Sequence, residues 1–243
     1  MSYFNIRKID AIDSTNEALK KQYQRGEIHH GELLWAKDQT KGKGQREAKW
    51  YSQAGKNLTF SFFLSHDISP FDSPFHLNCL IALGVKNVLS RLEIPQISVK
   101  WPNDILSVNK KIGGILIENS YRGSKWIGSI IGIGLNVNQD EFKNIPRASS
   151  FYLQSNKHYD LTEILNFLLK EFEESLLLAK KYQEVLDEFN ASLYGYQTEQ
   201  NFRIGKIIFP AKIQGVNDRG MLVLQNENEE TKTYGLKEIE LIY

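Results

Sequence analysis

Cysteine is nearly absent from this sequence: Cys79 is the only one among 243 residues, so an intrachain disulfide is excluded. Such a chain suits a reducing compartment. Uninterrupted apolar stretches of the roughly 20 residues that span a membrane are also missing. The N-terminal residues 1–8 lack the apolar segment of a signal peptide. We therefore expect a cytoplasmic protein with no membrane partner.

A strong charge of either sign is missing as well. The 30 Lys and Arg residues nearly balance the 29 Asp and Glu residues, which leaves a net charge of +1. No global field would therefore recruit nucleic acid. The five histidines lack the spacing of a metal site such as His-Glu-x-x-His, and there is no Gly-x-Ser-x-Gly elbow of a serine hydrolase. Binding of phosphate would have to come from a local cluster of cations.

The residues that are present favour a folded protein, since 41% are hydrophobic and disordered chains have fewer. Alternation predicts strands, and a period of 3.6 predicts helices. Ser14 and Glu17 have capping-box spacing, and Gly26 is placed to end the first helix. The predicted strands cover residues 3–12, 31–37, 57–65, 97–101, 111–119 and 126–138, and the predicted helices cover 14–26, 76–92 and 161–190.

The C-terminal residues have a different pattern, which begins after Tyr194-Gly195-Tyr196. Five short strands in fewer than fifty residues are typical of a small SH3-like barrel. We expect two domains, residues 1–194 and residues 195–243. The predicted strands of the second domain cover residues 202–209, 211–216, 220–225, 231–234 and 239–243.

The most informative motif is Lys100-Trp101-Pro102-Asn103-Asp104, which is followed by the run from Lys111 to Glu118. Its proline keeps the preceding tryptophan out of a helix, and its asparagine and aspartate suit a turn. Lys111 is predicted at the mouth of a strand as a compact positive charge. Gly113 and Gly114 would let a ligand approach that strand closely. A plain β-hairpin with a polar tip is the alternative interpretation.

Asp104 has three open interpretations: a turn residue, a magnesium ligand, or a group that orients Lys111.

The loop from Gly42 to Arg46 supplies two cations and two glycines, so its backbone N–H groups could bind an anion. It is not a P-loop, and a basic surface loop is the alternative. For Ser14-Thr15-Asn16, a purely structural role as a helix N-cap is the alternative interpretation. Cys79 is predicted to be a buried thiol without a nucleophilic role.

Taken in order, these segments resemble biotin–protein ligases over nearly the whole chain. The resemblance rests on Ser14-Thr15-Asn16, the loop from Gln39 to Arg46 before Trp50, and the motif at residues 100–104. It continues through the run from Gly132 to Asn138 and through Arg147-Ala148-Ser149-Ser150. It implies an α/β fold of the class II synthetase-like type, with a mixed sheet flanked by helices and a C-terminal SH3-like barrel.

The activity that the resemblance implies has two steps. Biotin is activated by ATP as biotinyl-5'-AMP, and the biotinyl group is then transferred to a lysine of a biotin carboxyl carrier protein. ATP, biotin and Mg²⁺ are the implied substrates and cofactor, and the carrier domain is the implied partner. The first predicted strand begins at residue 3, so we expect no DNA-binding domain and no DNA partner. A homodimer is left open.

The resemblance also implies the site residues. Trp50 would form an apolar wall for both biotin and the adenylate. The catalytic residues would be Lys111, Lys43, Arg46 and Asp104, and Asp104 is also the candidate metal ligand. Biotin would be bound by Ser14, Thr15, Asn16, Gln39, Gly42, Lys43, Gly44, Gln45, Trp50, Lys111, Gly113 and Gly114. ATP and the adenylate would be bound by Lys43, Arg46, Trp50, Asn103, Lys111, Asn136, Ala148, Ser149 and Ser150.

The loop departs from the common family pattern Gly-Arg-Gly-Arg-x-Gly-Arg. Lys43 replaces the first arginine, Gln45 the second, Glu47 the third glycine and Ala48 the last arginine. We interpret Arg46 as the guanidinium displaced by one position. A lipoate–protein ligase or octanoyl transferase, which shares the catalytic fold, is one alternative function. A non-catalytic module that binds biotin or the carrier is the other.

Overall fold

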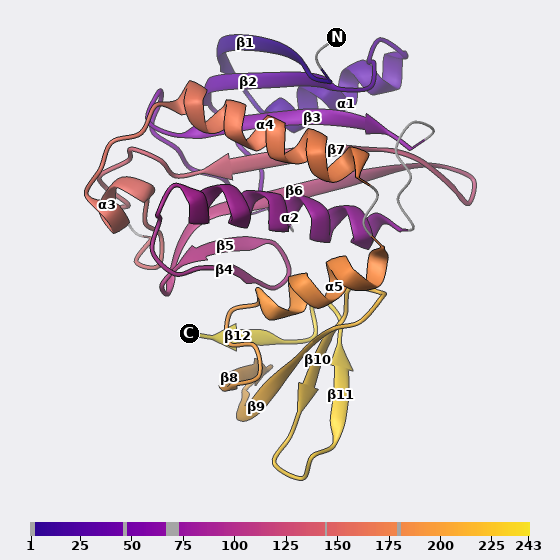
Figure 1. Ribbon diagram of the computed structural model, residues 1–243, viewed down its shortest axis with the longest axis vertical. Helices are drawn as coiled ribbons and strands as arrows, with labels where there is room; N and C mark the ends of the chain where they lie inside the picture. Colours follow the sequence, from indigo (N-terminus) through magenta and orange to yellow (C-terminus); the bar gives the residue numbers. More distant parts are fainter. Residues whose placement is uncertain (1–2, 46–47, 67–72, 144, 179–180) are drawn as a thin grey trace.

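A computed structural model describes residues 3–45, 48–66, 73–143, 145–178 and 181–243, which form two sheets and several helices (Figure 1). The helices are α1 (Thr15–Arg25), α2 (Pro74–Arg91), α3 (Phe151–Ser155), α4 (Leu161–Leu177) and α5 (Tyr182–Ala191). The first sheet contains β1 (Asn5–Ile12), β2 (Glu32–Gln39), β3 (Leu58–Ser65), β4 (Ile97–Lys100), β5 (Asp104–Ser107), β6 (Lys110–Arg122) and β7 (Lys125–Leu135). The second contains β8 (Glu199–Ile204), β9 (Ile207–Val216), β10 (Leu222–Gln225), β11 (Thr231–Tyr234) and β12 (Glu240–Ile242).

The first sheet is mixed, as predicted. Its strands follow the order β1-β2-β3-β7-β6-β5-β4. β1 and β2 are parallel, and the other neighbours are antiparallel. A parallel pair needs a crossover, and α1 supplies it between β1 and β2. The end of α1 follows the predicted signal, because Gly26 takes a left-handed conformation there.

The two faces of this sheet are covered differently (Figure 1). Adjacent residues of β3 point to opposite faces. Phe62 faces α4, where its ring lies 5.7 Å from that of Phe172, and α2 packs beside α4. Phe63 faces α1 and packs with Leu19 in a separate small cluster. Because α1 is the only helix against its face in the described residues, part of that face stays open.

The predicted helix at residues 161–190 is wrong in one respect, because two helices, α4 and α5, occupy this stretch. Each helix has its own apolar stripe, so the hydrophobic period alone does not reveal the break. Leu177 and Leu178, at the end of α4, are 65% and 71% exposed. α5 then packs on β9 and lies between the two sheets (Figure 1).

β5 was not predicted: it lies between β4 and β6 and pairs with both, so the predicted strands at 97–101 and 111–119 are not direct partners. The polar turn at residues 101–103 therefore joins β4 to β5, and a second turn at residues 108–109 leads into β6. Ile105 and Leu106 are fully buried. An apolar segment this short, between two turns, carries little periodic signal.

The second sheet has the order β11-β10-β9-β8-β12, and all its pairs are antiparallel. Its edge strands β11 and β12 do not pair in the described part of the chain, so the sheet is not a closed barrel. The predicted break between the strands at 202–209 and 211–216 is wrong, because the chain turns at Gly205 and Pro210 lies within β9. The ladder between β9 and β10 begins at Lys212, so Pro210 costs it no hydrogen bond.

Two expectations from composition can be compared with the described residues. No helix there has both the length and the apolar character needed to cross a membrane. Cys79 is fully buried in α2, and burial raises the pKa of its thiol well above the ordinary value. The predicted burial of this thiol is confirmed.

Candidate active site

A pocket of about 200 Å³ opens on the face of the first sheet that α1 covers. It lies between α1, the loop after β2, and the strands β3, β6 and β7. It brings together most of the predicted site residues. Those that line it are Ser14, Thr15, Asn16, Gln39, Lys43, Gly44, Gln45, Trp50, Asn103, Asp104, Lys111 and Gly114.

The other predicted residues do not line this pocket. Gly113 faces away from it, because a Cβ at that position would lie 2.6 Å from the Leu135 side chain. Arg46 lies outside the described residues. Gly42, Asn136, Ala148, Ser149 and Ser150 lie around the pocket in positions described below.

One end of the pocket is a network of neutral polar groups. The backbone N–H of Thr15 donates to Gln39 Oε1 at 2.8 Å, and the Thr15 hydroxyl lies 3.1 Å from the same oxygen. The Ser61 hydroxyl is 2.6 Å from Thr15 Oγ1 and donates to Asn16 Oδ1 at 2.6 Å. The Ser14 side chain makes no capping hydrogen bond, so the predicted capping box is wrong. These groups offer donors and acceptors without a net charge.

Ser61 is a site residue that the sequence analysis missed. It is fully buried in β3 and lines the pocket beside Thr15 and Asn16. The signal was a hydroxyl, one of two in the otherwise apolar run Leu58–Leu64, where a buried polar group needs partners. Those partners come from α1, which only the folded structure places opposite β3.

The floor of the pocket is a pair of cross-strand glycines, Gly114 of β6 and Gly134 of β7. The Trp50 indole lies over both. A Cβ at Gly134 would come within 2.6 Å of the indole, whereas one at Gly114 would meet it at 3.7 Å. Gly132, two residues before Gly134 on the same face of β7, similarly leaves room for the Asn16 side chain. The structure therefore gives Gly132 and Gly134 a role that the sequence analysis did not assign.

The opposite end of the pocket carries charge. Lys111 Nζ lies 2.6 Å from Asp104 Oδ1, and Lys100 Nζ lies 3.8 Å from Asp104 Oδ2. Burial lowers the pKa of Lys100. The turn is held against β6, because Asn103 Nδ2 donates to the Ile115 carbonyl at 2.7 Å. Of the three interpretations of Asp104, these contacts favour a group that orients Lys111.

The loop after β2 folds back on itself beside the pocket. The Trp50 N–H donates to the Gly42 carbonyl at 2.9 Å, and the Gly44 N–H donates to the Ala48 carbonyl at 2.7 Å. Lys43 Nζ lies 2.8 Å from Glu17 Oε1 of α1. This hydrogen bond lowers the pKa of Glu17. The Lys43 ammonium is thus paired with a carboxylate at the rim of the pocket.

The segment after β7 runs along the start of β6, next to the charged end. The Lys111 N–H donates to the Arg147 carbonyl and the Ser149 N–H to the Lys111 carbonyl, both at 2.8 Å, so Ala148 lies beside Lys111. Asn136 Nδ2 donates to the Ser149 carbonyl at 2.9 Å. Asn136 Oδ1 is buried and has no hydrogen-bond partner in the described part of the chain.

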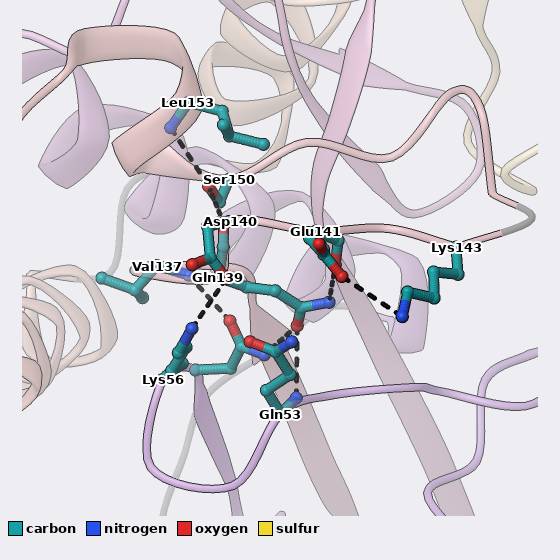
Figure 2. Close-up of polar contacts among 10 residues, drawn as sticks. Gln53, Lys56, Val137, Gln139, Asp140, Glu141, Lys143, Ser150 and Leu153 are labelled. Atoms are coloured by element: carbon teal, nitrogen blue, oxygen red, sulfur yellow. Dashed lines mark hydrogen bonds and ion pairs between the residues drawn. The ribbon is translucent and has the colours of Figure 1, made fainter.

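A second set of hydrogen bonds, centred on Gln139, anchors this segment (Figure 2). Gln139 Oε1 accepts from the Gln53 N–H at 3.2 Å and from Asn57 Nδ2 at 2.5 Å. The Ser150 hydroxyl donates to the Gln139 carbonyl at 2.6 Å and accepts from the Leu153 N–H at the start of α3. Ser150 therefore acts as a helix cap in this structure. The loop after Trp50 and the segment beside Lys111 are held to one another.

The charged end has no cluster typical of a metal site. No group of three His, Cys, Asp or Glu side chains that could hold a metal ion occurs within the described ranges. Both oxygens of Asp104 face lysine ammonium groups. This donor set does not fit a metal ion held by the protein, since a divalent cation needs several oxygen ligands.

Comparisons with known proteins give the family. The Biotin/lipoate A/B protein ligase family profile matches residues 9–136. The bifunctional ligase/repressor BirA of Bacillus spizizenii is 30% identical over 246 residues, covering 96% of this chain and 72% of that protein. A biotin–[acetyl-CoA-carboxylase] ligase of Mycobacterium tuberculosis is 28% identical, over 70% of this chain and 65% of that protein. The solved structure of Aquifex aeolicus biotin protein ligase in complex with biotin and ATP is similar with a TM-score of 0.81 and 31% identity, covering 98% of both chains. The chain therefore belongs to the biotin/lipoate A/B protein ligase family.

Proposed function

We propose that this protein is a biotin–protein ligase, which forms biotinyl-5'-AMP from biotin and ATP and transfers biotin to a lysine of a biotin carboxyl carrier protein. The observation that carries the proposal is the division of one pocket into a neutral polar end and a charged end. The neutral end, with Thr15, Gln39 and Ser61, suits the ureido ring of biotin. The charged end, with Lys111, suits a carboxylate and a phosphate.

In the first step, a carboxylate oxygen of biotin attacks the α-phosphorus of ATP. The bond to the bridging oxygen breaks, and pyrophosphate leaves. Lys111 is our choice for the cation that stabilises negative charge around the reacting phosphate. Asp104, 2.6 Å from its ammonium group, would hold Lys111 in position. Lys43 and Arg46 would close the loop over the same phosphate.

In the second step, the amine of the carrier lysine attacks the acyl carbon of the anhydride. The bond to the phosphate oxygen breaks, AMP leaves, and the new amide nitrogen loses a proton. The roles of the remaining predicted residues belong to this proposal. Asn136, Ala148 and Ser149 lie beside Lys111, which supports a place for the adenosine there.

Several finer predictions are part of the same proposal. We propose that residues 1–194 form the catalytic domain and residues 195–243 a second domain of SH3-like type, which the five antiparallel strands support. The predicted Mg²⁺ has no ligand assigned in this chain, because Asp104 is engaged by two lysines. A cytoplasmic location and a homodimer stay predictions.

The test is to incubate the protein with ATP and biotin and to measure biotinyl-adenylate and pyrophosphate. A carrier domain added afterwards should acquire biotin at one lysine and release AMP. The names of the relatives favour biotin over lipoate. Pyrophosphate release with lipoate or octanoate but not with biotin would contradict the proposal. Binding of biotin without any turnover would favour the non-catalytic alternative.

Ser61→Ala tests the neutral end of the pocket. The change leaves Asn16 Oδ1 without its buried donor, which costs about 1–3 kcal/mol, whereas the Thr15 hydroxyl keeps its contact with Gln39 Oε1. We expect the KM for biotin to rise about tenfold and the KM for ATP to stay within about twofold. Thr59→Val is the matched control, because it removes a buried hydroxyl of the same strand that bonds Ala36 and does not line the pocket. A similar rise in both variants would show a general effect on β3.

A further inference from the structure

The second sheet reaches the charged end of the pocket through Tyr243, which follows β12. The face of its ring contacts two cations. The guanidinium carbon of Arg147 lies 4.4 Å from the ring centroid, and Lys100 Nζ lies 4.8 Å from it. The Tyr194 ring, 5.6 Å away, supports Tyr243 edge-on. The mechanism proposed above uses neither Lys100, the Arg147 side chain nor Tyr243.

Both cations are connected to the site. Lys100 Nζ lies 3.8 Å from Asp104, whose other oxygen holds Lys111. The backbone carbonyl of Arg147 accepts from the Lys111 N–H at 2.8 Å. The contacts therefore form a closed ring from Tyr243 through Arg147, Lys111, Asp104 and Lys100 and back to Tyr243.

This ring of contacts carries an excess of positive charge. Lys100 and Lys111 lie against the single carboxylate of Asp104, and the charges of Arg147 and of the more distant Glu240 also act on Lys100. Burial and the charge of Asp104 raise the pKa of the Tyr243 phenol, so it does not supply a counter-charge at neutral pH. An aromatic face orients a cation without neutralising it. The cluster is thus built to receive a further anion.

We propose that Lys100 and Arg147 bind the terminal phosphates of ATP, and that Tyr243 is the positioning residue that holds the two cations in place. This inference rests on the proposed function, in which Lys111 serves the α-phosphate. The β- and γ-phosphates continue from that point and carry most of the nucleotide's charge. Two cations adjoining Lys111 would bind them, and would hold pyrophosphate before it leaves.

The test compares Tyr243→Leu with Tyr243→Phe by equilibrium binding of inorganic pyrophosphate and of AMP. Tyr243→Leu removes the aromatic face, so pyrophosphate should bind about tenfold more weakly, while AMP binding stays within about twofold. The KM for ATP should rise by the same factor, without a rise in the KM for biotin. Tyr243→Phe keeps the aromatic face and removes only the phenol and its hydrogen bond with Arg147, so it should lose much less pyrophosphate affinity than Tyr243→Leu.

Tyr234→Leu is the matched control, because Tyr234 lies in the same sheet and its ring faces Lys232 at 5.3 Å, away from the site. It should leave binding of both probes unchanged. Lys100→Met tests the same subsite by removing one of its two cations, without changing a residue of the second sheet. It should weaken pyrophosphate binding as well. Equal weakening of AMP and pyrophosphate, a loss in Tyr243→Phe as large as in Tyr243→Leu, or unchanged pyrophosphate binding would each overturn the assignment.

The result is separable from that of the proposed function. A parent protein that binds pyrophosphate in a Tyr243-dependent way but forms no biotinyl-adenylate would contradict the ligase and support this subsite. A parent that forms biotinyl-adenylate, with Tyr243→Leu binding pyrophosphate normally, would support the ligase and overturn the subsite.

Discussion

Lys111→Ala is expected to lower the rate of pyrophosphate release by at least about 100- to 1,000-fold, because loss of one preorganised group that stabilises transition-state charge has effects of this size. The fold should be retained, since the Lys111 side chain is 35% exposed and contributes mainly its ion pair with Asp104. The measurement is the initial rate of pyrophosphate release from ATP and biotin, together with the midpoint of thermal unfolding.

Lys110→Ala is the control for this variant. The neighbouring lysine carries the same charge, but its ammonium group donates to the Pro146 carbonyl and does not line the pocket. We expect it to keep a rate close to that of the parent protein. A Lys111→Ala variant that releases pyrophosphate as fast as Lys110→Ala would exclude Lys111 as the phosphate-binding lysine.

Arg46→Ala should release free biotinyl-adenylate about ten- to a hundredfold faster than the parent protein. The anhydride must be kept from water until the carrier arrives, and a charge-assisted hydrogen bond to its phosphate contributes roughly 1.5–3 kcal/mol. If this difference falls on the off-rate, the stated range follows. The escape is measured as adenylate in solution and as biotin on bystander proteins.

Lys43→Ala should leak less than Arg46→Ala. Arginine can bind two phosphate oxygens at once, whereas lysine is a point charge. The structure adds a second reason, because the Lys43 ammonium is already paired with Glu17 at 2.8 Å and must leave that carboxylate to reach a ligand. Equal leakage from the two variants, or none from Arg46→Ala, would return Arg46 to the role of a surface residue.

The sequence was informative where a function needs several residues in a short run. Ser14-Thr15-Asn16, the loop before Trp50 and the motif ending in Asp104 are each local, and the fold brings all three to one pocket. The C-terminal end of α1 was also accessible, because Gly26 is a local signal. The mixed character of the first sheet was implied by the family resemblance and not by any local pattern.

Features that depend on long-range pairing were not accessible. Ser61 belongs to the site only because β3 pairs with β7 and faces α1. Gly134 matters because Trp50, more than eighty positions earlier, lies over it. The break between α4 and α5 was hidden for the opposite reason, since both helices have the same period and nothing in that period records a change of direction.

The glycine at position 134 also restricts the order in which this pocket can evolve. A methyl group at position 114 would meet Trp50 at 3.7 Å, an ordinary contact, whereas one at position 134 would meet the indole at 2.6 Å. Substitutions at position 134 are therefore epistatic with position 50: a smaller residue must replace Trp50 before a larger one can replace Gly134. A lineage that adapts this pocket to another acid would pass through a variant in which a smaller residue at position 50 widens the pocket. If position 134 changed first, the new side chain would clash with the Trp50 indole.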